Sequence, residues 1–240
     1  MARFIDLSHV FEDGMPGIRM RAADGSEVRL TARIRTLVTH EQSRPNYQGK
    51  AEFALTEVSF QTSIGTYLDA PYVRYPHGRD IGALRVEELV LPGLLIDLTH
   101  LRAGEMAGIE DLRKGAAGGS HGELDVAGKA VLCRFGWDRH WGSEAYHTYP
   151  FLSRAAIRVL AEGGARLVGV DTINIDDGAD PERPAHSRFL EHDIFIVENL
   201  CNLGALQEAA ANRPFRFFAL PIRAKGAGSM PVRAFAEMMD

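Results

Sequence analysis

The most informative stretch of this 240-residue sequence is Ser63-Ile64-Gly65-Thr66-Tyr67-Leu68-Asp69-Ala70-Pro71. Ser63, Tyr67 and Asp69 are separated by even numbers of residues, so an extended chain would point all three to one face. The glycine in this stretch permits an unusual backbone dihedral or a close approach, and the final proline ends regular strand pairing. The pattern indicates a candidate site, although a strand end with a capping aspartate would look the same.

A second candidate pair lies in the C-terminal third of the chain. Glu198 closes the apolar run 194–197, where a carboxylate is costly unless it is paired or bound to a ligand. His186 precedes Glu198 by twelve residues, and a helical turn and a strand between them could bring the two side chains together. A hydrogen-bonded structural histidine is the alternative interpretation of His186.

The order and spacing of several short motifs resemble the metal-dependent cyclase family, which includes bacterial kynurenine formamidase and isatin hydrolase. The resemblance covers most of the chain. The matching motifs are Asp6-Leu7-Ser8-His9, Asp13-Gly14-Met15-Pro16, Gly65-Thr66, Asp69-Ala70-Pro71, Gly169-Val170-Asp171-Thr172, Ala185-His186, Glu198-Asn199-Leu200, Asn202-Leu203, Leu220-Pro221-Ile222 and Pro231-Val232-Arg233-Ala234. The resemblance implies a single cyclase-like domain over residues 1–240. Its fold would be the swivelling β/β/α type of α/β protein, with a mixed sheet core and peripheral helices.

The sequence departs from the family's pattern His-x-Gly-Thr-His-x-Asp-x-Pro-x-His at three histidine positions. In relatives the first two histidines and the aspartate bind a metal, whereas Ser63 and Tyr67 stand at those histidine positions here. The last histidine, an acid/base in relatives, is Val73. A serine hydroxyl or a phenol is a poor zinc ligand, so the first metal position should be nearly lost. The chain resembles a branch of the family with Ser and Tyr at these two positions.

Three residues still match family ligands, namely Asp69, His186 and Glu198. One imidazole and two carboxylates can hold a single divalent ion such as zinc or manganese, with water in the open positions. The resemblance implies an arylformamidase-like hydrolase that opens an amide, formamide or lactone bond of a small molecule. Tyr67 could then donate a hydrogen bond to the developing oxyanion or orient the water.

Two further candidates and one alternative function belong to this interpretation. Ser63 keeps a polar group at the first position, and His77 could supply a displaced acid/base, although an exposed loop histidine is the other interpretation of His77. The altered positions also allow a different class of protein. This alternative is a catalytically inactive member of the fold that binds a small molecule without hydrolysing it.

Composition narrows the remaining function classes. The formal net charge of −5 disfavours a nucleic-acid partner, and no apolar run is long enough for a transmembrane helix. The N-terminus lacks the apolar run of a signal peptide, so the cytoplasm is the expected compartment. Cys133 and Cys201 lie in apolar stretches and are expected to be buried thiols. Family resemblance also implies a homodimer or homotetramer.

Hydrophobic periodicity predicts a strand-rich chain. Residues 28–34 and 53–60 alternate with period two, which predicts half-buried antiparallel strands. Five later runs are uniformly apolar and predict central strands covered on both faces: 94–96, 130–132, 167–170, 194–197 and 217–220.

Helix signals are fewer than strand signals. Residues 153–162 have helical spacing, with Ser153 as the N-cap and Gly163-Gly164 as the stop. A shorter helix is expected over residues 108–114. The glycine-rich segment 115–122 is expected to be a surface loop.

Overall fold

The computed structural model describes residues 3–116, 124–211 and 213–239. Its backbone contacts group into two compact units, unit 1 (Met1–His9 and Thr66–Asp240) and unit 2 (Val10–Gly65). The glycine-rich loop expected at 115–122 lies outside the described residues from position 117 onward. One folding domain over residues 1–240 stays a prediction.

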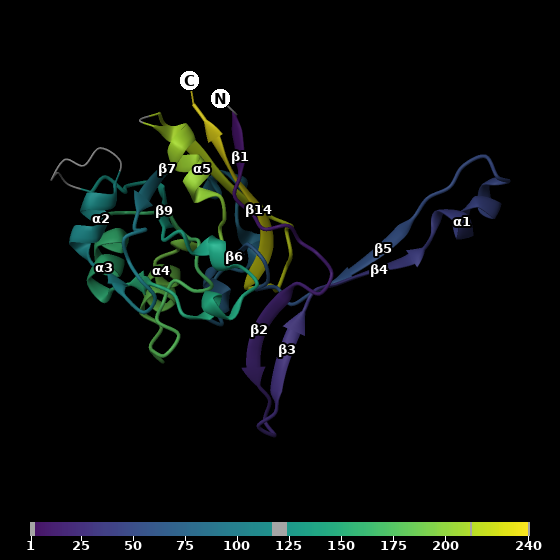
Figure 1. Cartoon of the computed structure of the whole chain (residues 1–240), viewed down its shortest axis with the longest axis horizontal. Helices are drawn as coiled ribbons and strands as arrows, with labels where there is room; N and C mark the ends of the chain where they lie inside the picture. The colour runs from purple at the N-terminus through teal and green to yellow at the C-terminus, as the bar shows by residue number, and fades with distance from the viewer. Residues whose placement is uncertain (1–2, 117–123, 212, 240) are drawn as a thin grey trace. The chain divides into compact units, whose positions relative to one another are not determined.

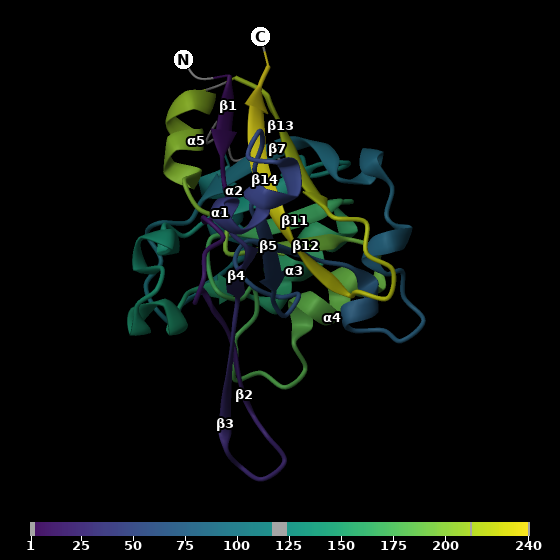
Figure 2. The ribbon, with the colours of Figure 1, turned by 90° about the vertical axis from the view of Figure 1, so that its right-hand side faces the viewer.

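Unit 1 is built on a mixed eight-stranded sheet, in the order β1-β14-β13-β7-β9-β11-β12-β6. Figure 2 shows β1, β13 and β14 side by side. Strand β6 also pairs with β14, so the strand order closes on itself. The strands are β1 (Phe4–Asp6), β6 (Tyr67–Asp69), β7 (Val90–Asp97), β9 (Ala130–Arg134), β11 (Leu167–Val170), β12 (Phe195–Glu198), β13 (Phe215–Pro221) and β14 (Ser229–Met238).

The central strands β7, β9, β11 and β12 run parallel, whereas β12 pairs antiparallel with β6. All five apolar runs form strands, and β9, β11 and β12 are buried almost throughout, as the uniform apolar pattern predicted. The run 217–220 differs. Buried and exposed residues alternate along β13, because this strand lies in the antiparallel part of the sheet between β7 and β14.

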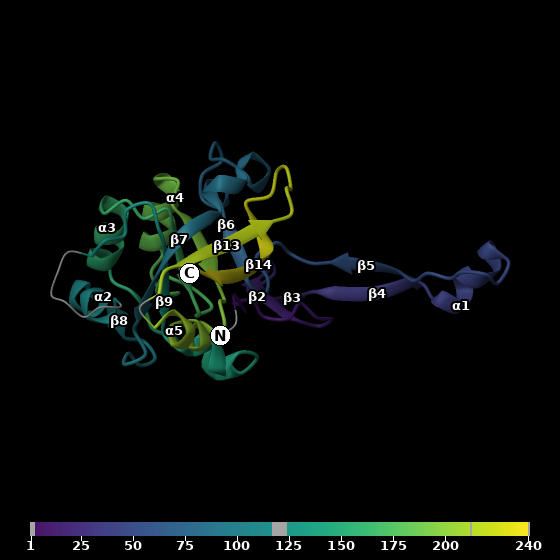
Figure 3. The ribbon, with the colours of Figure 1, turned by 90° about the horizontal axis from the view of Figure 1, so that it is seen from above.

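Helices cover the parallel part of the sheet. Helix α3 packs against α2 and α4, α2 contacts β7, and α4 contacts β12 (Figure 3). Apolar side chains of these helices, such as Leu160 and Phe189, join strand residues such as Val131 and Val168 in one core cluster. The helices of unit 1 are α2 (Ile109–Gly115), α3 (Arg154–Glu162), α4 (Pro184–Glu191) and α5 (Leu203–Ala210), and a small parallel pair is formed by β8 (Met106–Ala107) and β10 (Phe151–Leu152).

Both predicted helices are confirmed. The Ser153 side chain accepts a hydrogen bond from the Ala156 backbone N–H at 3.2 Å and so caps α3, which ends before Gly163. The helices α4 and α5 were not predicted, although Pro184 at the first position of α4 is a known start signal. Cys133 and Cys201 are buried free thiols, as expected. In the described part of the chain, no helix has the length and apolar character needed to cross a bilayer.

Unit 2 consists of two separate hairpins (Figure 1). Strand β2 (Pro16–Arg21) pairs with β3 (Glu27–Thr31), and β4 (Arg33–Val38) pairs with β5 (Leu55–Ser59). The second hairpin also carries α1 (His40–Ser43) and the 3-10 helix η1 (Arg44–Tyr47).

Residues 28–34 form antiparallel strands as predicted, but in two strands rather than one, because the chain changes partners at Ala32. The Ala32 backbone N–H donates to the Met15 carbonyl at 3.1 Å, and its carbonyl accepts from the Gly14 N–H at 3.0 Å. Strand β3 therefore ends and β4 begins around this residue. The half-buried character expected for 53–60 is wrong, since every residue of β5 is exposed.

Candidate metal centre

Three side chains from three elements of unit 1 meet at one buried point. Asp69 ends β6, His186 lies in the first turn of α4, and Glu198 ends β12. The antiparallel pairing of β6 with β12 places Tyr67 opposite Glu198 and Asp69 opposite Ile196. One potential ligand atom from each of the three residues lies within 4.8 Å of the others. The sequence predicted that these side chains converge, and the structure brings them together.

Asp176 fixes the orientation of the His186 ring. The imidazole Nδ1 lies 2.7 Å from Asp176 Oδ2, and the backbone N–H groups of Ala185 and His186 donate to the same carboxylate at 2.6 and 3.1 Å. This leaves Nε2 facing the two acids, 3.5 Å from Asp69 Oδ2 and 3.7 Å from Glu198 Oε1. A carboxylate behind a histidine in this way is the usual support of a metal-binding imidazole.

The two carboxylates differ in how their oxygens are satisfied. Glu198 accepts from the Ile175 N–H at 2.8 Å through Oε1 and from the Tyr67 hydroxyl through Oε2. Asp69 Oδ1 is buried and has no hydrogen-bond partner among the residues that the structure describes. An orphaned buried carboxylate oxygen is costly in a native protein and calls for an explanation such as an ion.

The charges of the cluster perturb its protonation. Burial alone would lower the pKa of His186, but the Asp176 hydrogen bond and the carboxylates of Asp69 and Glu198 raise that pKa to about 10. The pKa of Glu198 is raised to about 7. Burial is the largest cause, the charge of Asp69 adds to it, and the charge of His186 opposes it. Without a metal, protons thus offset part of the negative charge, and a divalent cation could take over that role.

Other polar groups of unit 1 lie around the cluster. The pKa of Tyr67 is raised well above its ordinary value by burial and by the charges of Glu198 and Asp69, so its hydroxyl stays a donor. The pKa of Tyr149 is raised to about 12, by burial and then by the charge of Glu198. The Arg183 Nε lies 3.9 Å from Asp176 Oδ2 and adds a cation behind His186.

The remaining predicted site residues come from other parts of the chain. Ser63 belongs to unit 2 and precedes β6 rather than lying on it. His77 is exposed in the turn after the 3-10 helix η2 (Pro71–Val73). Neither residue is a member of the metal-capable group found among the described residues, and their roles stay predictions.

Sequence reasoning missed Asp176. Ten residues separate it from His186, and no periodicity links a loop carboxylate to a helix that the sequence had not revealed. The available signal was indirect, because a ligand histidine normally has a carboxylate or carbonyl behind it. Any of the acidic residues between β11 and α4 would have met that criterion.

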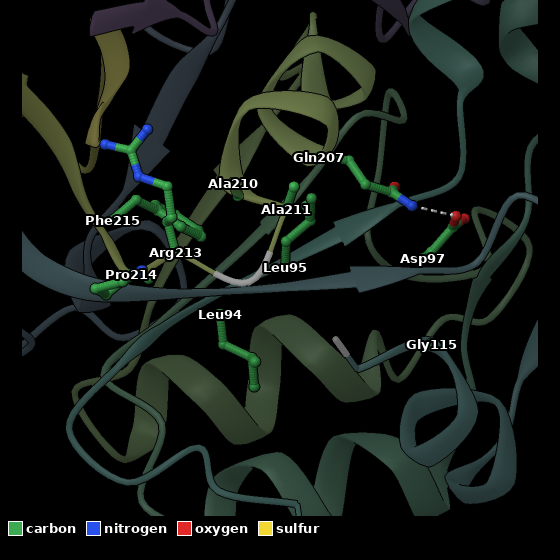
Figure 4. A pocket seen from close by; sticks show the side chains of 11 residues that line it. Leu94, Leu95, Asp97, Gly115, Gln207, Ala210, Ala211, Arg213, Pro214 and Phe215 are labelled. Atoms are coloured by element: carbon green, nitrogen blue, oxygen red, sulfur yellow. Dashed lines mark hydrogen bonds between the residues drawn. The ribbon is translucent and has the colours of Figure 1, made fainter. Parts of the chain in front are cut away.

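A separate cavity of about 600 Å³ lies in unit 1 beside β7, α5 and the start of β13 (Figure 4). Its described lining contains none of the three clustered residues. The polar groups of this cavity are engaged with one another, since Asp97 Oδ2 accepts from Gln207 Nε2 at 2.9 Å and Gln207 Oε1 accepts from Arg134 at 2.7 Å. Arg213, which also lines the cavity, donates to the Met239 carbonyl at 3.2 Å.

The donor set of the cluster suits a divalent cation. One imidazole nitrogen and two carboxylate oxygens form a mixed N/O site of the kind used by zinc, manganese and iron, with positions left for water. The unpaired Asp69 Oδ1 and the carboxylate support behind His186 both fit that interpretation.

Comparison with known proteins gives consistent results. The profile of the Cyclase family matches residues 5–177. Kynurenine formamidases from Bacillus thuringiensis (strain Al Hakam) and from Bacillus anthracis are each 30% identical over 170 residues, which covers 71% of this chain and 73% of the relative.

Solved structures resemble the fold over nearly the whole chain. Isatin hydrolase A from Labrenzia aggregata, bound to benzyl benzoate, superposes with a TM-score of 0.78 at 21% identity, covering 99% of this chain and 94% of the other. Isatin hydrolase A from Ralstonia solanacearum gives 0.79 at 20% identity, covering 98% and 91%. At such identities the likeness establishes the fold, and it confirms the expected cyclase-like α/β architecture with a mixed sheet.

Proposed function

Since the chain belongs to the Cyclase family, we propose that it is a metal-dependent hydrolase that opens an amide, formamide or lactone bond of a small molecule. One observation carries this proposal: Asp69, His186 and Glu198 meet from three elements, with one carboxylate oxygen left unpaired. The family profile ends at residue 177, so the assignment of His186 and Glu198 rests on geometry rather than on the profile.

We assign one divalent ion, zinc or manganese, to Asp69, His186 and Glu198. When bound, such an ion would polarise a substrate carbonyl and lower the pKa of a coordinated water. The protein's part is to hold the ligands: Asp176 keeps the His186 Nε2 turned toward the acids, and the Ile175 N–H fixes one Glu198 oxygen. One ion rather than two is proposed, because Ser63 and Tyr67 offer poor ligand atoms for a second.

Tyr67 is proposed to stabilise negative charge near the scissile bond. Its raised pKa keeps the hydroxyl protonated beside the cluster. In this role the hydroxyl would turn its one proton from Glu198, to which it now donates, toward the substrate oxygen. Ser63 is proposed as a catalytic residue because it stands at a histidine position of the family pattern, and His77 because it lies four residues after Val73 and could supply a displaced acid/base. The exposed position of His77 would suit exchange of a proton with solvent.

The alternative is an inactive small-molecule-binding protein of the same fold. The observation that favours it is Val73, an exposed apolar residue where relatives have an acid/base histidine. Elemental analysis of protein purified without added metal, combined with formamide, aryl ester and lactone hydrolysis assays, separates the two functions. The hydrolase proposal expects about one ion per chain and turnover of at least one substrate class. Absence of both metal and turnover supports the binder.

Replacing Tyr67 with phenylalanine tests its proposed role. Loss of one preorganised donor is expected to lower kcat by about 10²-fold. Metal content should remain near that of the parent, because the ligand atoms are untouched. Tyr75→Phe is the matched control, since the Tyr75 hydroxyl donates to the Ser187 carbonyl at 2.8 Å and lies outside the cluster. A Tyr67→Phe variant that loses the ion instead would mean that the phenol only supports Glu198.

Replacing Asp176 with asparagine tests the support of His186. The neutral amide binds the imidazole more weakly, so metal affinity should fall by about 10–100-fold. Metal titration followed by calorimetry measures this change. Asp177→Asn alters the adjacent aspartate, whose side chain caps the Ala179 N–H at 2.9 Å, and should leave affinity unchanged. Equal affinities for parent and Asp176→Asn would remove Asp176 from the site.

A further inference from the structure

Arg183 has an unusual environment for a partly buried arginine. Its side chain is 27% exposed, and its guanidinium makes no hydrogen bond to any residue that the structure describes. Its ion-pair contact, from Nε to Asp176 Oδ2, spans 3.9 Å, which exceeds hydrogen-bonding distance. Arg134 and Arg79 are covered to a similar degree, 26% and 33% exposed, yet each donates to a side-chain acceptor, at 2.7 and 3.0 Å respectively. Arg183 therefore keeps the donors of its guanidinium fork available for a ligand.

The backbone holds Arg183 beside the helix that carries His186. Arg183 has φ 49° and ψ 63°, the left-handed conformation that residues other than glycine rarely adopt. Two hydrogen bonds support it, from the Arg183 N–H to the Asp180 carbonyl at 3.2 Å and from the Ser187 N–H to the Arg183 carbonyl at 2.9 Å. Arg183 is the N-cap residue of α4, three positions before His186. Strained backbone of this kind is commonest at functional sites.

Arg183 acts on the groups of the candidate metal centre. The Asp176 oxygen that it contacts also lies 2.7 Å from His186 Nδ1. Burial raises the pKa of Tyr67 and of Tyr149, and the positive charge of Arg183 opposes this rise in both phenols. The guanidinium therefore lies close enough to the cluster to hold one end of a small molecule whose reacting bond is at the metal.

Tyr149 offers a second donor beside the cluster. Its hydroxyl makes no hydrogen bond within the described parts of the chain, and it lies against Gly178, where a Cβ would come within 3.0 Å of the phenol oxygen. Burial and then the charge of Glu198 raise the pKa of Tyr149 to about 12, so the phenol keeps its proton at neutral pH. Arg183 and Tyr149 can both donate to an anionic oxygen.

Charge favours an anionic group at this position. With a divalent ion bound, the carboxylates of Asp69, Glu198 and Asp176 are balanced by the two charges of the ion and the one of Arg183. An incoming anion therefore meets no net repulsion from these groups. A carboxylate has two oxygens that match the planar guanidinium fork. A phosphate dianion would exceed the single positive charge of Arg183.

We propose that Arg183 and Tyr149 bind a carboxylate carried by the substrate, so that the enzyme selects small anionic amides over neutral ones. The inference rests on the proposed hydrolase function and adds the substrate class to it. Arg183 is then a specificity-determining residue. Its fork donates to both carboxylate oxygens, and the Tyr149 hydroxyl supplies a third donor.

The test compares the three formamidobenzoate isomers with formanilide, which has the same ring and formamide group but no carboxylate. The measured quantity is the ratio of kcat/KM for the anionic to the neutral compound, with saturating manganese. Arg183→Met keeps the side-chain length and should lower this ratio by about 10–100-fold for the best isomer. Arg183→Lys keeps the charge but loses the fork and should fall between parent and Arg183→Met. Arg188→Met, the control, removes an arginine of the same helix that pairs with Glu162 at 3.7 Å and should leave the ratio unchanged.

A parent that prefers formanilide to all three isomers overturns the carboxylate site. A ratio that Arg183→Met leaves unchanged does so too, because equal loss on both compounds means that Arg183 only supports His186. Failure of the hydrolase function looks different, since the parent then turns over neither compound. In that case calorimetric binding of the same compounds decides, with tighter binding of a formamidobenzoate that Arg183→Met abolishes as the supporting result and equal or undetectable binding as the contrary one. If Arg183→Met does not fold, Tyr149→Phe should lower the same ratio by about tenfold.

Discussion

Replacing His186 with alanine is expected to remove the metal ion and the hydrolytic activity together. The imidazole is the one nitrogen ligand of the proposed site, and its Nε2 faces both carboxylates. Without it, Asp69 and Glu198 would have to hold the ion as a bare acidic pair. Metal content should fall from about one ion per chain to below about 0.1, and kcat/KM by at least about 10³-fold. Elemental analysis and steady-state kinetics on the same preparation measure both quantities.

The matched control is His192→Ala, at the C-terminal end of the same helix. His192 is exposed and caps α4, so its loss should change neither metal content nor rate. The His186→Ala variant should still fold, although Asp176 then loses a buried partner at a cost of about 1–3 kcal/mol. Retention of one tightly bound ion by His186→Ala would contradict the assignment of the site.

The buried strands could be predicted from the sequence, because a strand covered on both faces is a continuous run of apolar residues. Strands β9, β11 and β12 appear as short runs of valine, leucine, isoleucine and phenylalanine, and helix α3 has a serine cap and a glycine stop. These are local features, and tertiary packing reinforces them. The run 217–220 also formed a strand, β13, but its exposed positions were not predicted, because it lies in the antiparallel part of the sheet.

Unit 2 was poorly predicted for a physical reason. Alternation of apolar and polar residues normally means one buried face, and this inference failed for β5, where every residue is exposed. The alternation shows that one face of the strand is apolar, but it does not show that another part of the same chain covers that face. The break at Ala32 was also invisible, because it depends on backbone bonds to Met15 and Gly14.

The candidate site was also predictable only in part. Asp69, His186 and Glu198 were chosen because family resemblance and the cost of a buried acid pointed to them. Their proximity depends on the antiparallel pairing of β12 with β6 and on helix α4, which the sequence had not revealed. Asp176 has no local signature at all, since its role exists only once His186 is placed.

Metal affinity is expected to rise steeply with pH. Without metal, the folded-state pKa of His186 is about 10 against an ordinary 6.5, so its stabilising contribution is complete below pH 6.5 and lost by about pH 10. The pKa of Glu198 is raised from 4.5 to about 7 in the folded state. The folded protein therefore loses stability as pH rises from about 4.5 to about 7. Both shifts therefore make the metal-free protein less stable as pH rises.

A cation must displace these protons, because only the neutral imidazole and the ionised carboxylate are ligands. Near pH 6 binding should release more than one proton, and near pH 8 about one, so affinity should increase by about tenfold or more per pH unit across this window. Calorimetric titration with manganese in buffers of different ionisation enthalpy counts the protons directly. His192→Ala should reproduce the parental slope. An affinity that stays constant from pH 6 to 9 would mean that the ion does not bind at His186 and Glu198, since ligation there cannot occur without proton release.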